Sequence, residues 1–218
     1  MPSTRDIRRR IKSVKNTAQI TKAMQMVAAS KMRRAQQAAL AGRPYATMMN
    51  GVLAEVTHHA GDFTHPLMEE REIKKRCVIL VSSDKGLCGA LNSNLLREAA
   101  RFDKATTLFI TAGRKAAQFV ARTRRHLAAE FTYKDAPLFS EARAICKFAR
   151  ELFVRGEVDV VEVLYTNFVS TLNQKPEVIQ LLPVGEIKGF TIGVHGEERA
   201  QKLERGATEF LFEPSAGQ

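Results

Sequence analysis

The sequence contains no tryptophan, three tyrosines and three cysteines among 218 residues. The cysteines, Cys77, Cys88 and Cys146, form no CxxC pair, which fits free thiols in a reducing compartment better than a disulfide framework. No run of eighteen apolar residues occurs, so we expect no segment to cross a membrane unaided. The first 43 residues hold one acidic residue, Asp6, and eleven Lys or Arg, so they carry +10 of the net charge of +11. The partner of this segment is therefore expected to be acidic.

The basic segment has the pattern of a long amphipathic helix. Ser3 with Asp6 forms a start signal and Gly42 with Pro44 a stop signal, so the helix is predicted from about Thr4 to Ala41. We call "the seam" the apolar residues in near 4-3 spacing, interrupted only by Thr21 and Gln25: Ile7, Ile11, Val14, Ala18, Ala28, Met32, Ala35 and Ala39. The seam predicts a coiled coil, the alternative being a helix that lies on its own domain.

The remainder has the alternation of an α/β domain. A second helical stretch follows Pro44 and ends near Gly61. Apolar runs predict strands at 77–83 and 106–111 and a possible short strand near 130–133, separated by helices that end near 102, span 113–125 and span 140–155. The runs 158–170 and 176–184 are too close for a crossover helix and must pair antiparallel. The predicted fold is therefore α/β, with a Rossmann-like, mainly parallel sheet that ends in an antiparallel strand pair and a long N-terminal coiled-coil helix.

One glycine-containing turn, "SSDKGLCGALN" (82–92), lies between the first strand and its helix, where α/β folds often bind phosphates. It offers Asp84, Lys85, Gly86 and Gly89 but matches neither GxxxxGK[ST] nor GxGxxG. A tight connection in which the glycines allow positive φ is the favoured interpretation.

No other group of residues indicates chemistry. His58, His59 and His65, with Asp62, have no standard ligand spacing, which favours a polar surface turn over a metal site. Asp84 and Asp135 lack a partner carboxylate or nucleophile, so no catalytic, cofactor-binding or metal residues are predicted. Residue patterns make Cys77 and Cys146 small core residues; Cys146 shares a stripe with Phe139, Ala142 and Ala149.

Three partners suit the basic helix. Nucleic acid would contact Arg8, Arg9, Arg10, Lys12 and Lys15, although the helix has no aromatic residue for base stacking. A membrane surface suits the charge but not the Ala-rich apolar stripe. A helical protein partner with acidic surroundings would use both faces of the helix. Composition does not choose among these three.

Four segments carry a resemblance to a known family: "IRRRIKSVKNTAQITKAMQMVAASKMRRAQ", "SSDKGLCGALNSNL", "LYTNFVSTLNQKPEVIQLLP" and "FLFEP". In this order, from Ile7 to Pro214, they resemble the gamma subunit of F-type, proton-translocating ATP synthases. The resemblance implies a central-stalk rotor subunit that couples proton flow through the membrane sector to ATP synthesis or hydrolysis at the beta subunits, and that is not catalytic by itself. A nucleic-acid-binding α/β module with a basic helical arm is kept as the alternative.

The resemblance also implies partners and places. Lys22, Met24, Lys31 and Arg34 would contact acidic loops of the beta subunits inside the ring of alpha and beta subunits. The lower end of the domain and the region leading to Phe210 and Phe212 would meet the epsilon subunit and the membrane rotor ring. The turn 82–92 would bind no nucleotide, no nucleic acid would bind, and the protein would be peripheral on the cytoplasmic side of a bacterial inner membrane, attached only through the complex.

The expected organisation has four parts. Residues 1–61 form the helical arm that is half of the stalk coiled coil, 62–75 a linker, and 76–212 the α/β domain. Family members continue past "FEP" into a long C-terminal helix, so residues 213–218 are expected to be the truncated start of that region.

Overall fold

The computed structural model describes residues 3–59, 65–133 and 137–184 of the 218. The chain divides into two compact units, Met1–Ala46 and Thr47–Gln218. The predicted end of the α/β domain at 212 and the expected truncated segment 213–218 lie outside the described residues, as do Asp62 and Asp135.

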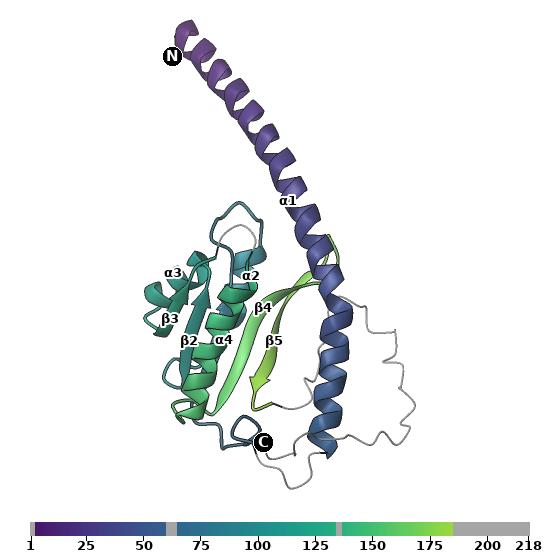
Figure 1. Cartoon of the computed structure of the whole chain (residues 1–218). Helices are drawn as coiled ribbons and strands as arrows, with labels where there is room; N and C mark the ends of the chain where they lie inside the picture. The colour runs from purple at the N-terminus through teal and green to yellow at the C-terminus, as the bar shows by residue number, and fades with distance from the viewer. Residues whose placement is uncertain (1–2, 60–64, 134–136, 185–218) are drawn as a thin grey trace. The chain divides into compact units, whose positions relative to one another are not determined.

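Helix α1 is a single element, Thr4–His59 (Figure 1). The predicted start is confirmed, since the Ser3 hydroxyl accepts a hydrogen bond from the backbone N–H of Arg5 at 3.2 Å. The predicted stop at Ala41 is wrong, because the helix continues through Gly42 and contains Pro44. A proline inside a helix removes one backbone hydrogen bond and costs roughly 3 kcal/mol, a local cost that the favourable residues on both sides can offset.

The sheet has five strands in the order β3-β2-β1-β4-β5. The first four strands pair in parallel, and β5 pairs antiparallel with β4, which confirms the predicted fold class. The strands are β1 (Arg76–Val81), β2 (Thr107–Ala112), β3 (His126–Phe131), β4 (Val160–Phe168) and β5 (Gln174–Leu182). The helices between them are α2 (Leu91–Ala99), α3 (Arg114–Arg122) and α4 (Phe139–Val154).

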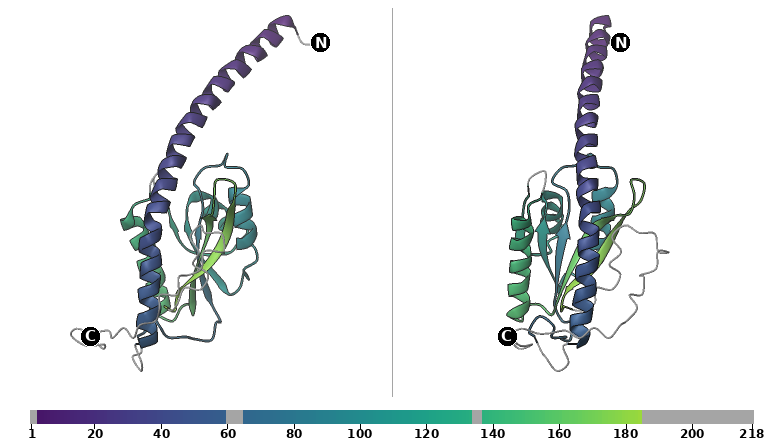
Figure 2. Two further views of the ribbon diagram at one scale, coloured as in Figure 1. Left: turned by 90° about the vertical axis from the view of Figure 1, so that its right-hand side faces the viewer. Right: turned by 45° about the vertical axis from the view of Figure 1, so that its right-hand side comes forward.

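Two apolar cores lie on opposite faces of the sheet. Leu95 of α2 and Val120 of α3 pack with Leu80, Phe109 and other residues on one face. On the other face, Phe153 and further α4 residues pack with Cys77, Ile79, Ile110 and Val161. The domain is therefore three-layered, with the sheet between α2 and α3 on one side and α4 on the other (Figure 2).

The two cysteines predicted to lie in the core have different environments. Cys77 is fully buried in β1, and burial raises the pKa of its thiol to about 12. Cys146 is exposed, so that prediction is wrong. Helix α4 buries the side that carries Ala149, Leu152 and Phe153, and of the predicted stripe only Ala149 reaches the core.

The segment before β1 is tied to the domain by polar contacts. The Arg71 guanidinium donates to the carbonyl of Phe153 at 3.0 Å and lies over the ring of that residue. The Asp159 carboxylate accepts the backbone N–H groups of Lys74 and Lys75 at 2.9 and 2.8 Å. These backbone hydrogen bonds, the one from Lys75 first, lower the pKa of Asp159. This part of the predicted linker is thus ordered against the domain.

Candidate functional site

The turn 82–92 follows β1 at the carboxyl edge of the sheet. Strand β1 lies between β2 and β4, and the chain reaches these neighbours through helices on opposite faces, α2 and α4. This is the switch point at which doubly wound folds bind ligands. The expected position of a nucleotide site in this fold is therefore the turn that contains Asp84, Lys85, Gly86 and Gly89.

Side chains inside the turn satisfy one another. The Ser83 hydroxyl donates to the carbonyl of Lys85 at 2.7 Å and accepts from the Asn92 amide at 2.8 Å. The same Asn92 amide contacts the Cys88 sulfur at 3.1 Å. Asn92 is the second residue of α2, so the start of this helix is bonded to the turn that precedes it.

The N-terminus of α3 is occupied by the same turn. A helix begins with four backbone N–H groups that have no partner within the helix. Arg114 N–H donates to the Asp84 carboxylate at 2.9 Å, Lys115 N–H to the Ser83 carbonyl at 3.2 Å, and Ala116 N–H to the Ser82 hydroxyl at 2.8 Å. The preceding N–H, that of Gly113, donates to the carbonyl of Phe131 at 2.9 Å. The chain itself thus fills the donors that would otherwise hold an anion.

The glycines of this edge differ in their roles. Gly89 adopts φ +60°, as the sequence predicted, but the other positive φ in the turn belongs to Leu87, at +62°. Gly86 has open space where a Cβ would lie, so its backbone does not require glycine. Gly113 has φ +106°, and a Cβ there would overlap the carbonyl oxygen of Ser82. The sterically demanding glycine is therefore Gly113, which precedes α3.

Tyr133 was missed by sequence reasoning. Its hydroxyl donates to the carbonyl of Ser82, and burial together with the nearby Asp84 carboxylate raises its pKa. The turn is held by Ser82, Asn92, Gly113 and Tyr133. These residues share no sequence motif that would have predicted their contacts. The one available signal was Gly113, placed between a predicted strand and a predicted helix.

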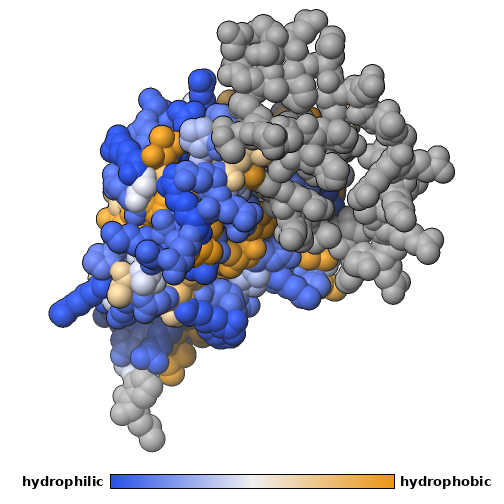
Figure 3. Space-filling view, turned by 90° about the horizontal axis from the view of Figure 1, so that it is seen from below, coloured by the Kyte–Doolittle hydropathy of each residue, from blue (hydrophilic) through white to orange (hydrophobic). Residues whose placement is uncertain are grey.

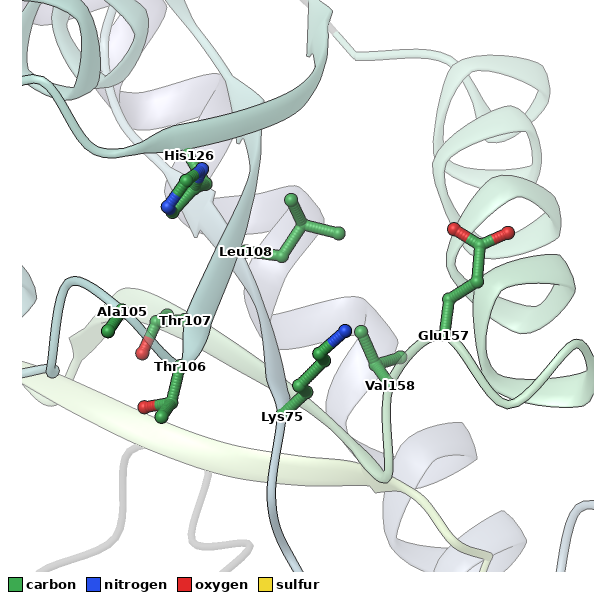
Figure 4. A pocket seen from close by; sticks show the side chains of 8 residues that line it. All are labelled: Lys75, Ala105, Thr106, Thr107, Leu108, His126, Glu157 and Val158. Carbon is green, nitrogen blue, oxygen red and sulfur yellow. The ribbon is translucent and has the colours of Figure 1, made fainter.

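A hollow of about 300 Å³ lies at the opposite edge of the sheet, where the parallel strands begin. Figure 4 shows Lys75, His126 and Glu157 around it on three separate segments, and Glu157 pairs with Arg155 at 3.7 Å. Seen from this side, hydrophilic residues dominate the visible described surface, with apolar ones between them (Figure 3). The hollow is lined by residues of both charges, and the arrangement of these residues does not indicate a reaction.

Helix α1 exposes all four predicted contact residues: Lys22, Met24, Lys31 and Arg34. At 3.6 residues per turn, Met24 and Lys31 share one side of the helix with Arg34 nearby, whereas Lys22 lies roughly half a turn away. The helix therefore brings three of the four together. A partner that contacts all four must touch two sides of the helix.

The seam is exposed along its length: Ile7, Ile11, Val14 and Met32 each retain 45% or more of their accessible surface. At Thr21, which interrupts the seam, the hydroxyl donates to the carbonyls of Thr17 and Ala18 at 3.0 Å. The polar interruption is thus satisfied within the helix. The apolar stripe remains available for another surface.

Metal and membrane sites are not indicated within the part of the chain that the structure describes. There, no group of three or more His, Cys, Asp or Glu is arranged to hold a metal ion. His65 is described, and its Nδ1 accepts the backbone N–H of Leu67 at 3.2 Å. The side chains of His58 and His59 lie outside the described residues. None of the described helices combines the length and apolarity needed to cross a membrane.

Known proteins resemble this chain over nearly its whole length. A family model described as ATP synthase matches residues 3–218. The ATP synthase gamma chain of Opitutus terrae is 47% identical over 216 residues, which cover 98% of this chain and 73% of that relative. The gamma chain of Methylacidiphilum infernorum is 42% identical over 221 residues, covering 99% and 74%. The chain thus spans about three quarters of the length of these relatives.

A solved structure shows the same likeness. It is the cryo-EM structure of the central stalk and c-ring of the Tetrahymena thermophila mitochondrial ATP synthase. The TM-score is 0.62 and the identity 26%, with 75% of this chain and 72% of that chain covered.

Proposed function

Because the chain belongs to the ATP synthase gamma chain family, we propose that it is a central-stalk rotor subunit that couples proton flow to ATP synthesis or hydrolysis at the beta subunits. The observation that carries this proposal is α1, a helix of 56 residues with an exposed apolar seam and a charge of +10 within the first 43 residues of the chain. A helix of this length measures roughly 84 Å and offers both an apolar stripe and a basic surface to partners. A rotating shaft needs both.

The proposed contacts with the beta subunits are electrostatic. Lys22, Lys31 and Arg34 are exposed, and contacts between exposed charges are weakly directional and screened by salt. Such contacts suit a surface that must leave one partner and meet the next. Met24, which is 53% exposed, adds an adaptable apolar contact.

The subunit is proposed to be non-catalytic. At the switch point, Asp84, Ser83 and Ser82 already occupy the first N–H groups of α3, which argues against a bound phosphate. The turn containing Lys85, Gly86 and Gly89 therefore serves as a connection. Calorimetry should detect no ATP or NAD binding, whereas micromolar binding lost in Lys85→Ala would restore an enzymatic interpretation.

Further partners follow from the family. The α/β domain is proposed to meet the epsilon subunit and the membrane rotor ring, and α1 the alpha and beta subunits. The protein would then sit on the cytoplasmic side of the inner membrane, attached only through the complex. We also propose the four-part organisation into arm (1–61), linker (62–75), domain (76–212) and C-terminal segment (213–218), the arm forming half of a coiled coil.

Assembly with alpha and beta subunits of a relative, such as that of Opitutus terrae, tests the proposal. Neutralising only one of Lys22, Lys31 or Arg34 should leave assembly intact, since each exposed pair contributes about 0.2 to 1 kcal/mol. The triple variant K22Q/K31Q/R34Q should weaken assembly most at low salt, and less as salt rises, because salt already screens these contacts in the unmodified chain. A matched triple on α4, R143Q/K147Q/R150Q, removes the same charge and should have little effect.

Two results would contradict this function. Failure of the unmodified chain to assemble would remove the rotor role. Tight binding to duplex DNA or RNA in a gel-shift assay at physiological salt, together with that failure, would favour the alternative of a nucleic-acid-binding module with a basic arm.

A further inference from the structure

Charge is distributed unevenly within the α/β domain as well as along the chain. Residues 91–125 contain eight Lys or Arg and two acidic residues, a net charge of +6. Residues 1–43 carry +10 of the total of +11, so the segments 44–90 and 126–218 together carry −5. A second basic region therefore lies in an otherwise acidic part of the sequence.

Much of this charge lies on one side of the domain, on helices α2 and α3. Both cover the same face of the sheet and bury Leu95, Ala99, Ala116 and Val120 against it. Five basic residues lie on the exposed sides of these helices and in the turn after α3, and we call them the α2–α3 basic face: Arg97, Arg114, Arg122 and Arg124, which are exposed, and Lys115, which is half-buried. Arg114 and Arg122 are eight residues apart on α3 and so lie about 12 Å apart along its outer side.

The other three of the eight cations do not belong to this face: Lys104 lies in the loop between α2 and β2, and Arg101 and Arg125 are engaged elsewhere. Arg101 pairs with Glu98 at 2.7 Å. Arg125 donates to the carbonyls of Phe102 and Ala100 and lies over the rings of Phe109 and Phe119. Within the described residues, no ion pair involves any residue of the α2–α3 basic face.

Two cations of this face, Arg114 and Lys115, are placed unfavourably in their own helix, whereas Arg97 and Arg122 lie in the last turns of α2 and α3, where a cation is favourable. The first turn of α3 carries Arg114 and Lys115 and no acidic residue. The positive end of a helix dipole repels cations, and the acidic group that offsets this here comes from the preceding turn, since the Asp84 carboxylate accepts the Arg114 N–H at 2.9 Å. Residues that oppose local stability are expected at functional surfaces.

We propose that the α2–α3 basic face is a docking surface for an acidic helix of another polypeptide. Arginine guanidinium groups bind carboxylates through two parallel hydrogen bonds, and four of the five cations are arginines. Carboxylates at positions i and i+4 of a helix repeat about every 6 Å, so two such repeats match the distance of about 12 Å between Arg114 and Arg122 along α3. The exposed residues between Arg114 and Arg122, which are Gln118 and Ala121, are uncharged and allow close approach.

Other classes of partner fit this face less well. None of the exposed large apolar side chains in the described part of the chain belongs to residues 91–125. The face therefore lacks the aromatic platforms that stack single-stranded bases and the apolar anchors that enter a membrane surface.

The test uses the full chain and a fluorescent 20-residue alanine-based helical peptide with glutamates at i and i+4. The variant R97Q/R114Q/R122Q should lose about tenfold in affinity, through loss of charge-assisted pairs. The variant R143Q/K147Q/R150Q removes equal charge from α4 on the opposite face of the sheet and should lose less than about twofold. Equal losses in the two variants would overturn the proposal.

Chemical modification of arginines shows whether the peptide binds to this face or to the basic α1. The experiment does not depend on the folding of any variant. Phenylglyoxal modification of the unmodified chain, read by mass spectrometry, should show protection by the peptide at Arg97, Arg114 and Arg122 and none at Arg143 and Arg150. Protection confined to α1 would contradict the proposal. So would protection of the same arginines by duplex DNA or phosphatidylserine vesicles but not by the peptide. Neither outcome bears on the rotor function, which is tested by assembly with alpha and beta subunits.

Discussion

The apolar residues of α1 and those of the sheet meet opposite environments, although both follow regular patterns. Val14 in the seam is 67% exposed, whereas Val78 in β1 is fully buried. The sheet finds its apolar partners within the chain, in α2, α3 and α4. The seam is an equally regular apolar pattern, but its side chains are exposed. Periodicity thus shows which face an element will bury, but not whether its partner belongs to the same chain.

The polar groups of the two regions differ in the same way. At the carboxyl edge of the sheet, the turn 82–92 satisfies the N–H groups of α3 and the side chains of its own residues. Ten of the eleven lysines and arginines of α1 are exposed, and Arg43 is half-buried. The domain thus satisfies its polar groups within the chain, whereas most basic side chains of α1 remain available to the partners that we propose.

The largest expected effect comes from the core. Phe109 is fully buried, meets Phe102 edge to face, and lies beneath Arg125. Phe109→Ala should lower the free energy of unfolding of the α/β domain by about 3 to 5 kcal/mol in urea denaturation. Val14→Ala, the matched change in the seam, should change it by less than about 0.5 kcal/mol. Similar losses in the two variants would erase the contrast between the regions.

The next effect concerns two glycines of the carboxyl edge. Gly113→Ala introduces a side chain at φ +106° and into the carbonyl of Ser82, so it should cost roughly 2 to 4 kcal/mol. Gly86→Ala meets open space and should be nearly neutral. Thermal unfolding of both variants checks this. A destabilised Gly86→Ala with a stable Gly113→Ala would mean that the turn is built differently.

A smaller effect is expected at Asp84. Its carboxylate accepts the Arg114 N–H at 2.9 Å, so Asp84→Ala should cost about 1 kcal/mol, as the loss of a helix cap does. Asp84→Asn keeps an acceptor and should retain most of the stability. Equal stability of all three proteins in urea denaturation would show that α3 does not depend on this contact.

The smallest effect appears at alkaline pH. Burial, the Glu177 carboxylate and a hydrogen bond to it raise the pKa of Tyr165 to about 12. A raised pKa contributes stability that is present below the unfolded pKa of about 10 and is lost as pH rises toward 12. Solvent screening at this half-buried site limits the contribution to about 1 kcal/mol or less.

Tyr165→Phe should therefore reduce the loss of stability between pH 10 and 12, measured by urea denaturation. Cys77 and Tyr133, whose pKa values are also raised, should keep part of that loss. An unchanged pH profile in Tyr165→Phe would rule out this assignment.

Local patterns predicted most of the fold. The apolar run of β1 and the short gap between β4 and β5 each indicated their structure directly, because strand burial and hairpin pairing depend on neighbouring residues. The continuation of α1 through Pro44 was not predicted, since the stop signal is local whereas the helix extends well beyond it on both sides. The exposure of Cys146 was missed because helical spacing does not show how far the buried face of α4 extends.

The candidate site was predicted less well for a physical reason. Asp84 caps a helix that begins 30 residues later, and Tyr133 reaches Ser82 across 51 residues. Contacts of this kind arise from the order of strands in the sheet, which no spacing in the sequence displays. The sequence predicted the position of the turn 82–92 but not the contacts that its residues make.

Amide exchange across residues 7–40 tests the central claim most directly. In the isolated chain, the seam is exposed, so this part of α1 should exchange rapidly while β1 stays protected. In complex with alpha and beta subunits, the same residues should become strongly protected, with little change in β1. If α1 of the isolated monomer is already as protected as β1, or gains no protection in the complex, then it is not a shaft that awaits its partners and the account is wrong.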